Sequence, residues 1–259
     1  PGALYSYVTM SLGPIAGFIT GWALILAYLT TGIAVASYTA PYAQTLLTNI
    51  HVTLPALLIF AVVVALVWLV AYRDVRLSAK MMLLLEGVSV SLILILGIAM
   101  VRHTGLHLGN QFALKGMTLN GLQGGMVLGV FSFVGFESAT ALGAEAKNPR
   151  RSIPRAVFMS TAIAGAFFML MSFIMVSSFS GYKIALSDPN LVALTAMADI
   201  AHAPLLGLLV SFGAVISLFA CSLACVTATS RILLSMSRDG LIHANLGRSH
   251  DTNATPHIA

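Results

Sequence analysis

The chain has 259 residues, of which 58% are hydrophobic and 8% are charged, with a formal net charge of +5 and a mean hydropathy of +0.95. Soluble domains carry about 25% charged residues, so this composition excludes an ordinary soluble domain and predicts an integral membrane protein. The basic residues lie between apolar segments, so their excess indicates membrane topology rather than a nucleic-acid partner.

Six apolar segments are long enough to form membrane-spanning helices, each of which needs roughly 20 mostly apolar residues. Hydrocarbon offers backbone groups no water partner, so the segments are expected to be helical. A β-barrel would show alternating segments of about ten residues instead. We expect one all-α membrane domain over residues 1–259, with spans at approximately 15–38, 54–72, 81–101, 122–142, 157–179 and 204–228.

The first predicted span carries hydroxyl groups at Tyr28, Thr30 and Thr31 that could line a binding site. Such hydroxyls also bond their own helix or a neighbouring helix, so a packing role is the simpler interpretation. Pro41 and Pro55 indicate turns in the connection to the second span.

The third predicted span contains Glu86 near its beginning. An ionisable residue in a membrane helix is a functional hypothesis by default, and a glutamate suits proton coupling. Pairing with Arg76 or Lys80 near the cytoplasmic face is an equal alternative. In the following loop, His103 and His107 could begin a metal site, but no further ligand lies nearby in sequence, so a solvated loop without metal is favoured.

The fourth predicted span is glycine-rich and contains one acidic residue, Glu137; from Gly121 to Gly143 it reads GLQGGMVLGVFSFVGFESATALG. Close packing of helices accounts for the glycines of its first half. Gly135 differs because it lies among aromatic residues beside Glu137, and a glycine-interrupted apolar segment indicates a broken helix in a transporter. Such a break frees backbone N–H and C=O groups that can hold a carboxylate and an ammonium group.

The sixth predicted span carries Ser222 and Cys225, which could line the same site, although packing is again favoured for each. Cys221 and Cys225 are four residues apart and are expected to be buried free thiols rather than metal ligands or a disulfide framework. Beyond this span, residues 231–250 are expected to form a cytoplasmic amphipathic segment, interrupted at Asp239-Gly240.

Basic residues alternate strongly between the loops. Ten of the 13 Lys and Arg residues lie in the segments 73–80 and 143–156 and after the sixth span, and three lie in the opposite loops. The positive-inside rule therefore places both ends of the chain in the cytoplasm. No HExxH, GxSxG or P-loop motif occurs, so neither an enzyme, nor a cofactor, nor ATP-driven transport is expected.

The run from Phe131 to Val157, FSFVGFESATALGAEAKNPRRSIPRAV, closely resembles the sixth span and following loop of permeases of the amino acid–polyamine–organocation (APC) superfamily. The segment from Tyr5 to Trp22 is similar to the beginning of the family's third span. The segment from Arg231 to His243, followed by Thr255-Pro256, is similar to the loop after the eighth. Ala144 departs from the acidic residue that many members have before Glu145.

This resemblance implies a LeuT-like fold of two inverted five-helix repeats (5+5) plus peripheral helices. The six spans would be the family's spans three to eight. The first two spans, including the broken first span that binds the substrate carboxylate, and the last spans would be missing, so the chain alone is not expected to transport.

The resemblance also implies roles for residues of the fourth predicted span. Phe131 matches an aromatic gate over the substrate, while Ser132 and Gly135 offer backbone groups and close approach. Glu137 would lie in or next to the unwound part, either as a proton-sensitive or substrate-facing carboxylate or as a group that ties helices together. Packing is the better interpretation for Phe133 or Phe136 alone.

The implied function is secondary active transport of amino acids or related amines across the cytoplasmic (inner) membrane by alternating access, coupled to protons or working by exchange. Substrate-binding residues would then be Phe131, Ser132, Phe133, Gly135, Glu137, Tyr28, Thr31, Ser222 and Cys225, and coupling residues would be Glu137 and Glu86. The expected partners are the substrate, a proton or counter-substrate and the lipid bilayer, and the sequence does not specify an oligomeric state. The alternatives are a non-transporting sensor or partner subunit on the same fold, or a truncated inactive relative.

Overall fold

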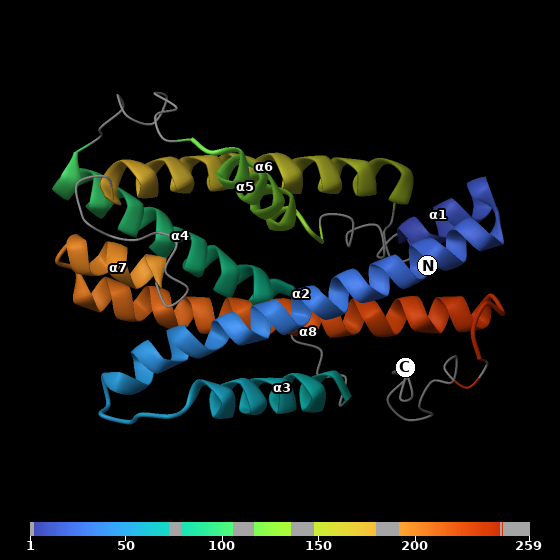
Figure 1. The fold of residues 1–259 in the computed structure, drawn as a ribbon, viewed down its shortest axis with the longest axis horizontal. Coiled ribbons are helices and arrows are strands. Elements are labelled where there is room, and N and C mark those ends of the chain that lie inside the picture. The colour runs from blue at the N-terminus through green and yellow to red at the C-terminus, as the bar shows by residue number, and fades with distance from the viewer. Residues whose placement is uncertain are drawn as a thin grey trace. The chain divides into compact units, whose positions relative to one another are not determined.

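The computed structural model describes residues 3–72, 79–105, 117–135, 148–179, 192–243 and 245. Within these residues the regular structure is entirely helical (Figure 1). The helices are α1 (Ala3–Leu12), α2 (Pro14–Thr48), α3 (Ala56–Tyr72), α4 (Ala79–Thr104), α5 (Leu119–Ser132), α6 (Pro149–Phe179), α7 (Ala193–Ile200) and α8 (Pro204–Arg238).

In the described part of the chain, four helical segments are long and apolar enough to cross a membrane, namely Pro14–Thr48, Leu84–Thr104, Arg150–Phe179 and Pro204–Arg238. Helix α3 is also apolar but shorter, with 17 residues. The predicted all-α membrane class is therefore confirmed, and the chain has the helices of a multi-pass membrane protein.

Helix α2 continues well beyond the expected end near residue 38, to Thr48. Pro41, which the sequence places in a turn, lies inside the helix. A proline within a helix removes one backbone hydrogen bond, and tertiary packing must offset that loss. The packing comes from Ala36 and Ala40, which are buried in a cluster with residues of α3: Ile59, Val63 and Val67.

Helix α8 is continuous to Arg238, whereas the sequence predicts a span that ends near residue 228 and a separate amphipathic segment. Ile232 and Met236 are 8% and 0% exposed and belong to the same buried cluster as Cys225. These three residues share one helix face at helical spacing, so packing continues along α8 past the expected boundary. The helix ends before Gly240, whose φ is +75°.

Other boundaries also differ from the expected ones. Helix α5 begins at residue 119, where the Thr118 hydroxyl caps it by accepting a hydrogen bond from the Gly121 N–H at 3.1 Å. It ends at Ser132, ten residues before the expected limit of 142, and residues 136–147 lie outside the described part. Helix α7 falls in a segment that was expected to be a loop.

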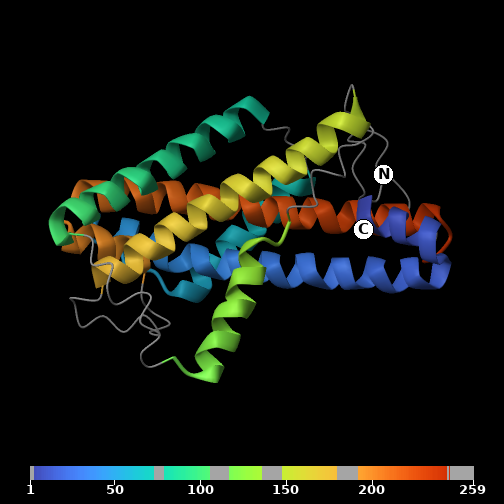
Figure 2. The same ribbon diagram turned by 90° about the horizontal axis from the view of Figure 1, so that it is seen from above.

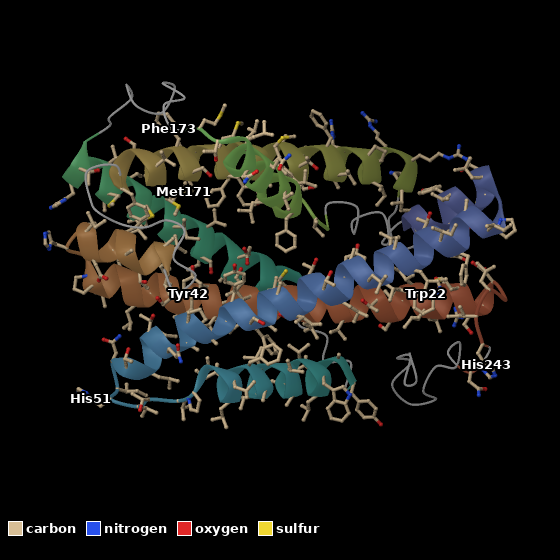
Figure 3. All side chains as sticks on the ribbon, viewed as in Figure 1. Trp22, Tyr42, His51, Met171, Phe173 and His243 are labelled. Atoms are coloured by element: carbon tan, nitrogen blue, oxygen red, sulfur yellow. The ribbon has the colours of Figure 1, made fainter. Side chains whose placement is uncertain are left out.

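The chain divides into two compact units, residues 1–91 with 208–259 and residues 92–207. In the first unit, α1 folds back on the beginning of α2 after Gly13, whose φ is +91°, and α3 packs beside α2 (Figure 2). In the second unit, α4 packs against α6, where a Cβ at Gly97 would lie 3.3 Å from Ile174 and 3.4 Å from Met171 (Figure 3). The small residue therefore permits close helix contact.

Candidate functional site

The end of α5 interrupts the glycine-rich apolar segment. The N–H groups of Phe133 and Val134 donate to carbonyls three residues earlier, each at 3.1 Å, which tightens the last turn. Gly135 follows with φ +95°, a conformation that residues with a Cβ rarely adopt. Helix α5 therefore ends at Ser132, and the described chain reaches a glycine of positive φ within an apolar sequence.

The two aromatic side chains beside this end have different surroundings. The Phe133 ring meets Phe168 of α6 edge-on, with 5.8 Å between ring centroids. Gly165 makes room for it, because a Cβ there would lie 3.3 Å from the Phe133 ring. Phe131, by contrast, is 42% exposed. Phe133 therefore packs onto α6, while Phe131 presents an accessible ring.

The polar residues predicted here are only partly described. The Ser132 hydroxyl donates to the Leu128 carbonyl at 2.8 Å, so its side chain bonds its own helix. Phe136 and Glu137 lie outside the described residues. Their predicted roles therefore remain predictions.

Residues predicted on α2 and α8 meet at a cavity of about 230 Å³ within the first unit. Tyr28, Ser222 and Cys225 line it and are 8%, 2% and 7% exposed. The rest of its lining is apolar and includes Leu29, Ile33, Val64, Trp68 and Val226. The Ser222 hydroxyl donates to the Leu218 carbonyl at 2.9 Å. Thr31 is not among the residues that line this cavity.

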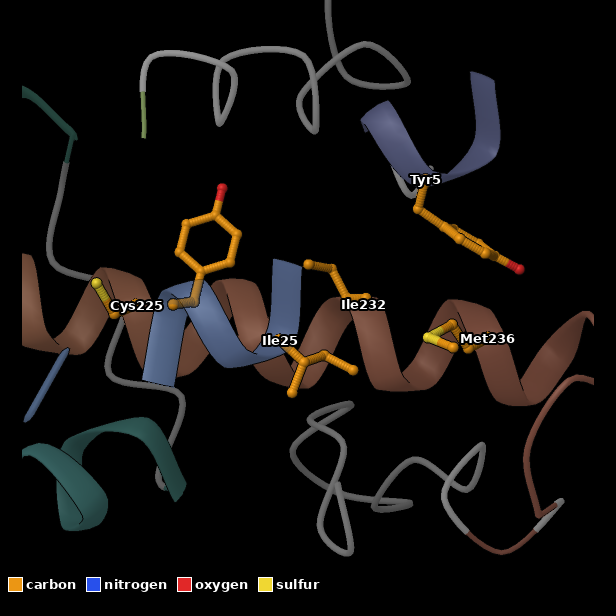
Figure 4. Close-up of a cluster of buried hydrophobic side chains, with 6 residues drawn as sticks. Tyr5, Ile25, Cys225, Ile232 and Met236 are labelled. Atoms are coloured by element: carbon orange, nitrogen blue, oxygen red, sulfur yellow. The ribbon is translucent and has the colours of Figure 1, made fainter. Parts of the chain in front are cut away.

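The cavity also depends on a residue that the sequence pattern did not single out. Gly32 lies in the lining, and a Cβ there would be 3.2 Å from the Cys225 Cβ. Its spacing of four residues from Tyr28 is the signal that could have identified it. Cys225 also packs in the buried cluster with Tyr5, Ile25 and Met236 (Figure 4). The cavity wall and the core of this unit therefore share side chains.

Glu86 lies on α4, and one carboxylate oxygen accepts a hydrogen bond from the Ser217 hydroxyl of α8 at 2.5 Å. The alternative partners, Arg76 and Lys80, have no described side chains. A hydroxyl can donate to a carboxylate or accept from a carboxyl group, so Ser217 can serve either form as a hydrogen-bond partner. This contact joins α4 to α8 within the first unit.

The family model for amino acid permeases matches residues 1–259. The chain belongs to the amino acid permease family. The predicted resemblance is therefore confirmed, and the family is one of membrane transporters rather than enzymes.

Similar characterised members of the family include three bacterial transporters. The chain is 27% identical to the methylthioribose transporter of Bacillus subtilis, with 98% of this chain and 57% of that protein covered. It is 24% identical to a branched-chain amino acid permease of the same organism, over 100% of this chain and 58% of the relative. It is 26% identical to a D-serine/D-alanine/glycine transporter of Escherichia coli, over 89% of this chain and 50% of the relative. The chain thus spans little more than half the length of these permeases.

Proposed function

We propose that the chain forms the middle part of a secondary active transporter that moves amino acids or related amines by alternating access. The observation that carries this proposal is the end of α5, where an apolar helix stops at Ser132 and Gly135 takes φ +95°. Backbone groups that leave a helix at membrane depth need partners, and a cavity that holds a polar substrate supplies them. Family membership supports the same conclusion.

The proposed substrate chemistry follows from the groups available at this break. The last carbonyls of a helix have no partner within it, so the C-terminal end of α5 can accept hydrogen bonds from the ammonium group of a substrate without a fixed charged side chain. Phe131 would cover the substrate as an aromatic gate, consistent with its 42% exposure.

For coupling, we propose that Glu137, Glu86 or both exchange protons during the cycle, or that the transporter works by exchange. Glu86 is a suitable group because its partner, Ser217, can accept or donate a hydrogen bond as the carboxyl changes its protonation. The distribution of Lys and Arg supports a cytoplasmic membrane location with both ends of this chain inside the cell.

Uptake measurements on the full-length protein in proteoliposomes test this proposal. A panel of labelled amino acids and amines is offered with and without a proton gradient. We expect saturable uptake of at least one of them, and Phe131→Ala should lower kcat/KM at least about tenfold, a loss of about 1.4 kcal/mol. Glu137→Gln and Glu86→Gln should reduce the effect of the gradient.

Phe158→Ala is the matched control, because Phe158 on α6 is 74% exposed and lies away from the break in sequence. It should leave uptake unchanged. Correctly inserted protein that transports no member of the panel would contradict the proposal and favour a sensor or partner subunit. Equal uptake by the Phe131→Ala and Phe158→Ala variants would exclude the gate.

A further inference from the structure

One face of α4 changes from apolar to basic as the helix reaches its C-terminal end. The residues of this face recur at positions i, i+3, i+4, i+7 and i+8, which places them on one side of the helix. Together with Ala201, they line a shallow cavity of about 400 Å³ in the second unit; they are Ile95, Ile98, Ala99, Arg102 and His103. The two isoleucines are 52% and 55% exposed, so the apolar part of the face is open to its surroundings.

A second histidine meets this face from a distant part of the chain. The rings of His103 and His202 lie edge to face, with 5.1 Å between centroids and 69° between planes. His202 belongs to the turn between α7 and α8, next to the cavity residue Ala201. Arg102 and His103 therefore line the basic end of the cavity, and the His202 ring lies against His103 next to it; guanidinium and imidazole N–H groups can donate hydrogen bonds to an anion.

The turn at His202 has a backbone conformation in which glycine is the usual residue. The Ala203 N–H donates to the Ala198 carbonyl at 2.9 Å, and the His202 N–H donates to the Asp199 carbonyl at 3.1 Å. This is the Schellman pattern, in which glycine is usual at the position that His202 occupies with φ +51°. Histidine tolerates this conformation better than most residues but still less easily than glycine.

The end of α2 provides an internal comparison. His51 has φ +58°, and the N–H groups of His51 and Val52 make the same two bonds, to Thr48 and Leu47. His51 lies at the exposed turn after α2 (Figure 3) and does not line the basic cavity. The two turns share a backbone pattern, but only the one at His202 adjoins Arg102 and a second imidazole.

We propose that this face of α4 binds an anionic phospholipid. The phosphodiester would bond to Arg102, His103 and His202, and an acyl chain would lie along Ile95 and Ile98. Arginine is suited to phosphate because its guanidinium forms paired hydrogen bonds. In a membrane helix, the point where apolar residues give way to basic ones lies at the level of the headgroups.

The open apolar part of the face favours a lipid over dipole compensation and over a free anion. Basic residues at a helix C-terminus can compensate the helix dipole, which applies to Arg102 and His103 on α4 and to His202 after α7, but dipole compensation does not account for the exposed Ile95 and Ile98. Asp199 is the nearest acidic residue along that turn, and it is not among the cavity residues. Inorganic phosphate would use the basic end alone, whereas a phospholipid also covers the exposed isoleucines.

The test measures lipid binding by the full-length protein in detergent, with phosphatidylglycerol, phosphatidylcholine and inorganic phosphate as probes. We expect phosphatidylglycerol to bind at least about fivefold more tightly than phosphatidylcholine. Arg102→Gln should weaken phosphatidylglycerol binding about tenfold, because a charge-assisted hydrogen bond is lost. Arg102→Lys should retain part of the affinity, and its unfolding temperature without lipid checks that the fold is intact.

His202→Gly and His51→Gly form the matched pair, since each relieves the same backbone conformation. Only His202→Gly should weaken phosphatidylglycerol binding. The proposal is overturned if Arg102→Gln binds this lipid as the unmodified protein does, or if both glycine variants have the same effect. Competition by inorganic phosphate as effective as that by the lipid would indicate a free-anion site and would also overturn it.

Discussion

Helices α8 and α5 are both apolar and contain glycine, yet they differ in how many of their side chains are buried against the rest of the described chain. Helix α8 has 35 residues and buries side chains along its length, including Ser222, Cys225, Ile232 and Met236. Helix α5 has 14 residues and buries none of them against the rest of the described chain. Packing therefore fixes α8, whereas local backbone conformation dominates α5.

Their glycines differ in the same way. A Cβ at Gly213 of α8 would lie 2.8 Å from the Ser89 Oγ of α4, so this glycine allows close contact between helices. At Gly124, Gly125 and Gly129 of α5, a Cβ would meet no atom within 4 Å in the described residues. Helix α8 is therefore held by packing, and the less packed α5 is followed by the glycine of positive φ at which we propose binding.

The largest expected effect comes from truncating matched methionines on the two helices. Met236 of α8 is 0% exposed, and Met126 of α5 is 63% exposed. Met236→Ala should lower the free energy of unfolding by about 2–5 kcal/mol, because it opens a cavity in the cluster with Tyr5 and Ile25. Met126→Ala should change it by less than about 0.5 kcal/mol. Thermal unfolding in detergent measures both, and equal losses would remove the distinction between the helices.

A smaller effect is expected at the end of α5. Gly135→Ala places a Cβ at φ +95° and should lower the free energy of unfolding by about 1–2 kcal/mol. Substrate uptake should fall as well. Gly124→Ala, inside α5 and facing open space, should be neutral or stabilise by up to about 1 kcal/mol. Uptake and unfolding are measured on both variants. If Gly135→Ala transports normally, the positive φ has no part in binding.

The smallest effect concerns the end of α8, which a side chain holds in place. The Tyr5 hydroxyl donates to the Asp239 carboxylate at 2.7 Å. Burial, and then the hydrogen bond and negative charge of Asp239, raise the pKa of Tyr5 from 10.0 to about 12. The raised value favours the neutral phenol. The contribution of the neutral Tyr5 phenol to the free energy of unfolding is therefore complete below pH 10 and is lost as the pH rises towards 12.

Ultraviolet titration of the phenols tests this contact, with the Tyr5→Phe variant identifying the Tyr5 signal. Asp239→Asn should lower the pKa of Tyr5 but leave it above 10, because burial remains. The substitution should cost roughly 0.5–1.5 kcal/mol in unfolding measurements. An unchanged Tyr5 titration in Asp239→Asn would show that the carboxylate does not act on the phenol.

Several features of the chain follow from local sequence. The apolar runs predict helices, and the described residues are helical. The motif from Phe131 to Val157 predicts the family, and the match over residues 1–259 confirms it. Gly135, which the sequence indicates as a break, takes φ +95° shortly after α5, a conformation that glycine adopts without strain. The roles of Glu137 and the other proposed binding residues remain predictions.

Other features need contacts that pattern alone does not specify. The continuation of α2 through Pro41 depends on packing against α3, and the length of α8 depends on Ile232 and Met236 finding Tyr5 and Ile25. The partner of Glu86 could not be chosen from sequence, because Ser217 is 131 positions away. The roles proposed for Phe131 and Phe133 can be distinguished only from the tertiary contacts, because Phe168 and Gly165 lie beside Phe133.

By itself, the sequence determined the membrane class and the family, because composition and a contiguous motif can be interpreted without tertiary contacts. Only the tertiary structure decided where α2 and α8 end, which hydroxyl meets Glu86, and that His103 and His202 form a pair. Each of these depends on side chains brought together from distant positions, where burial and hydrogen bonding offset the local preference of the chain.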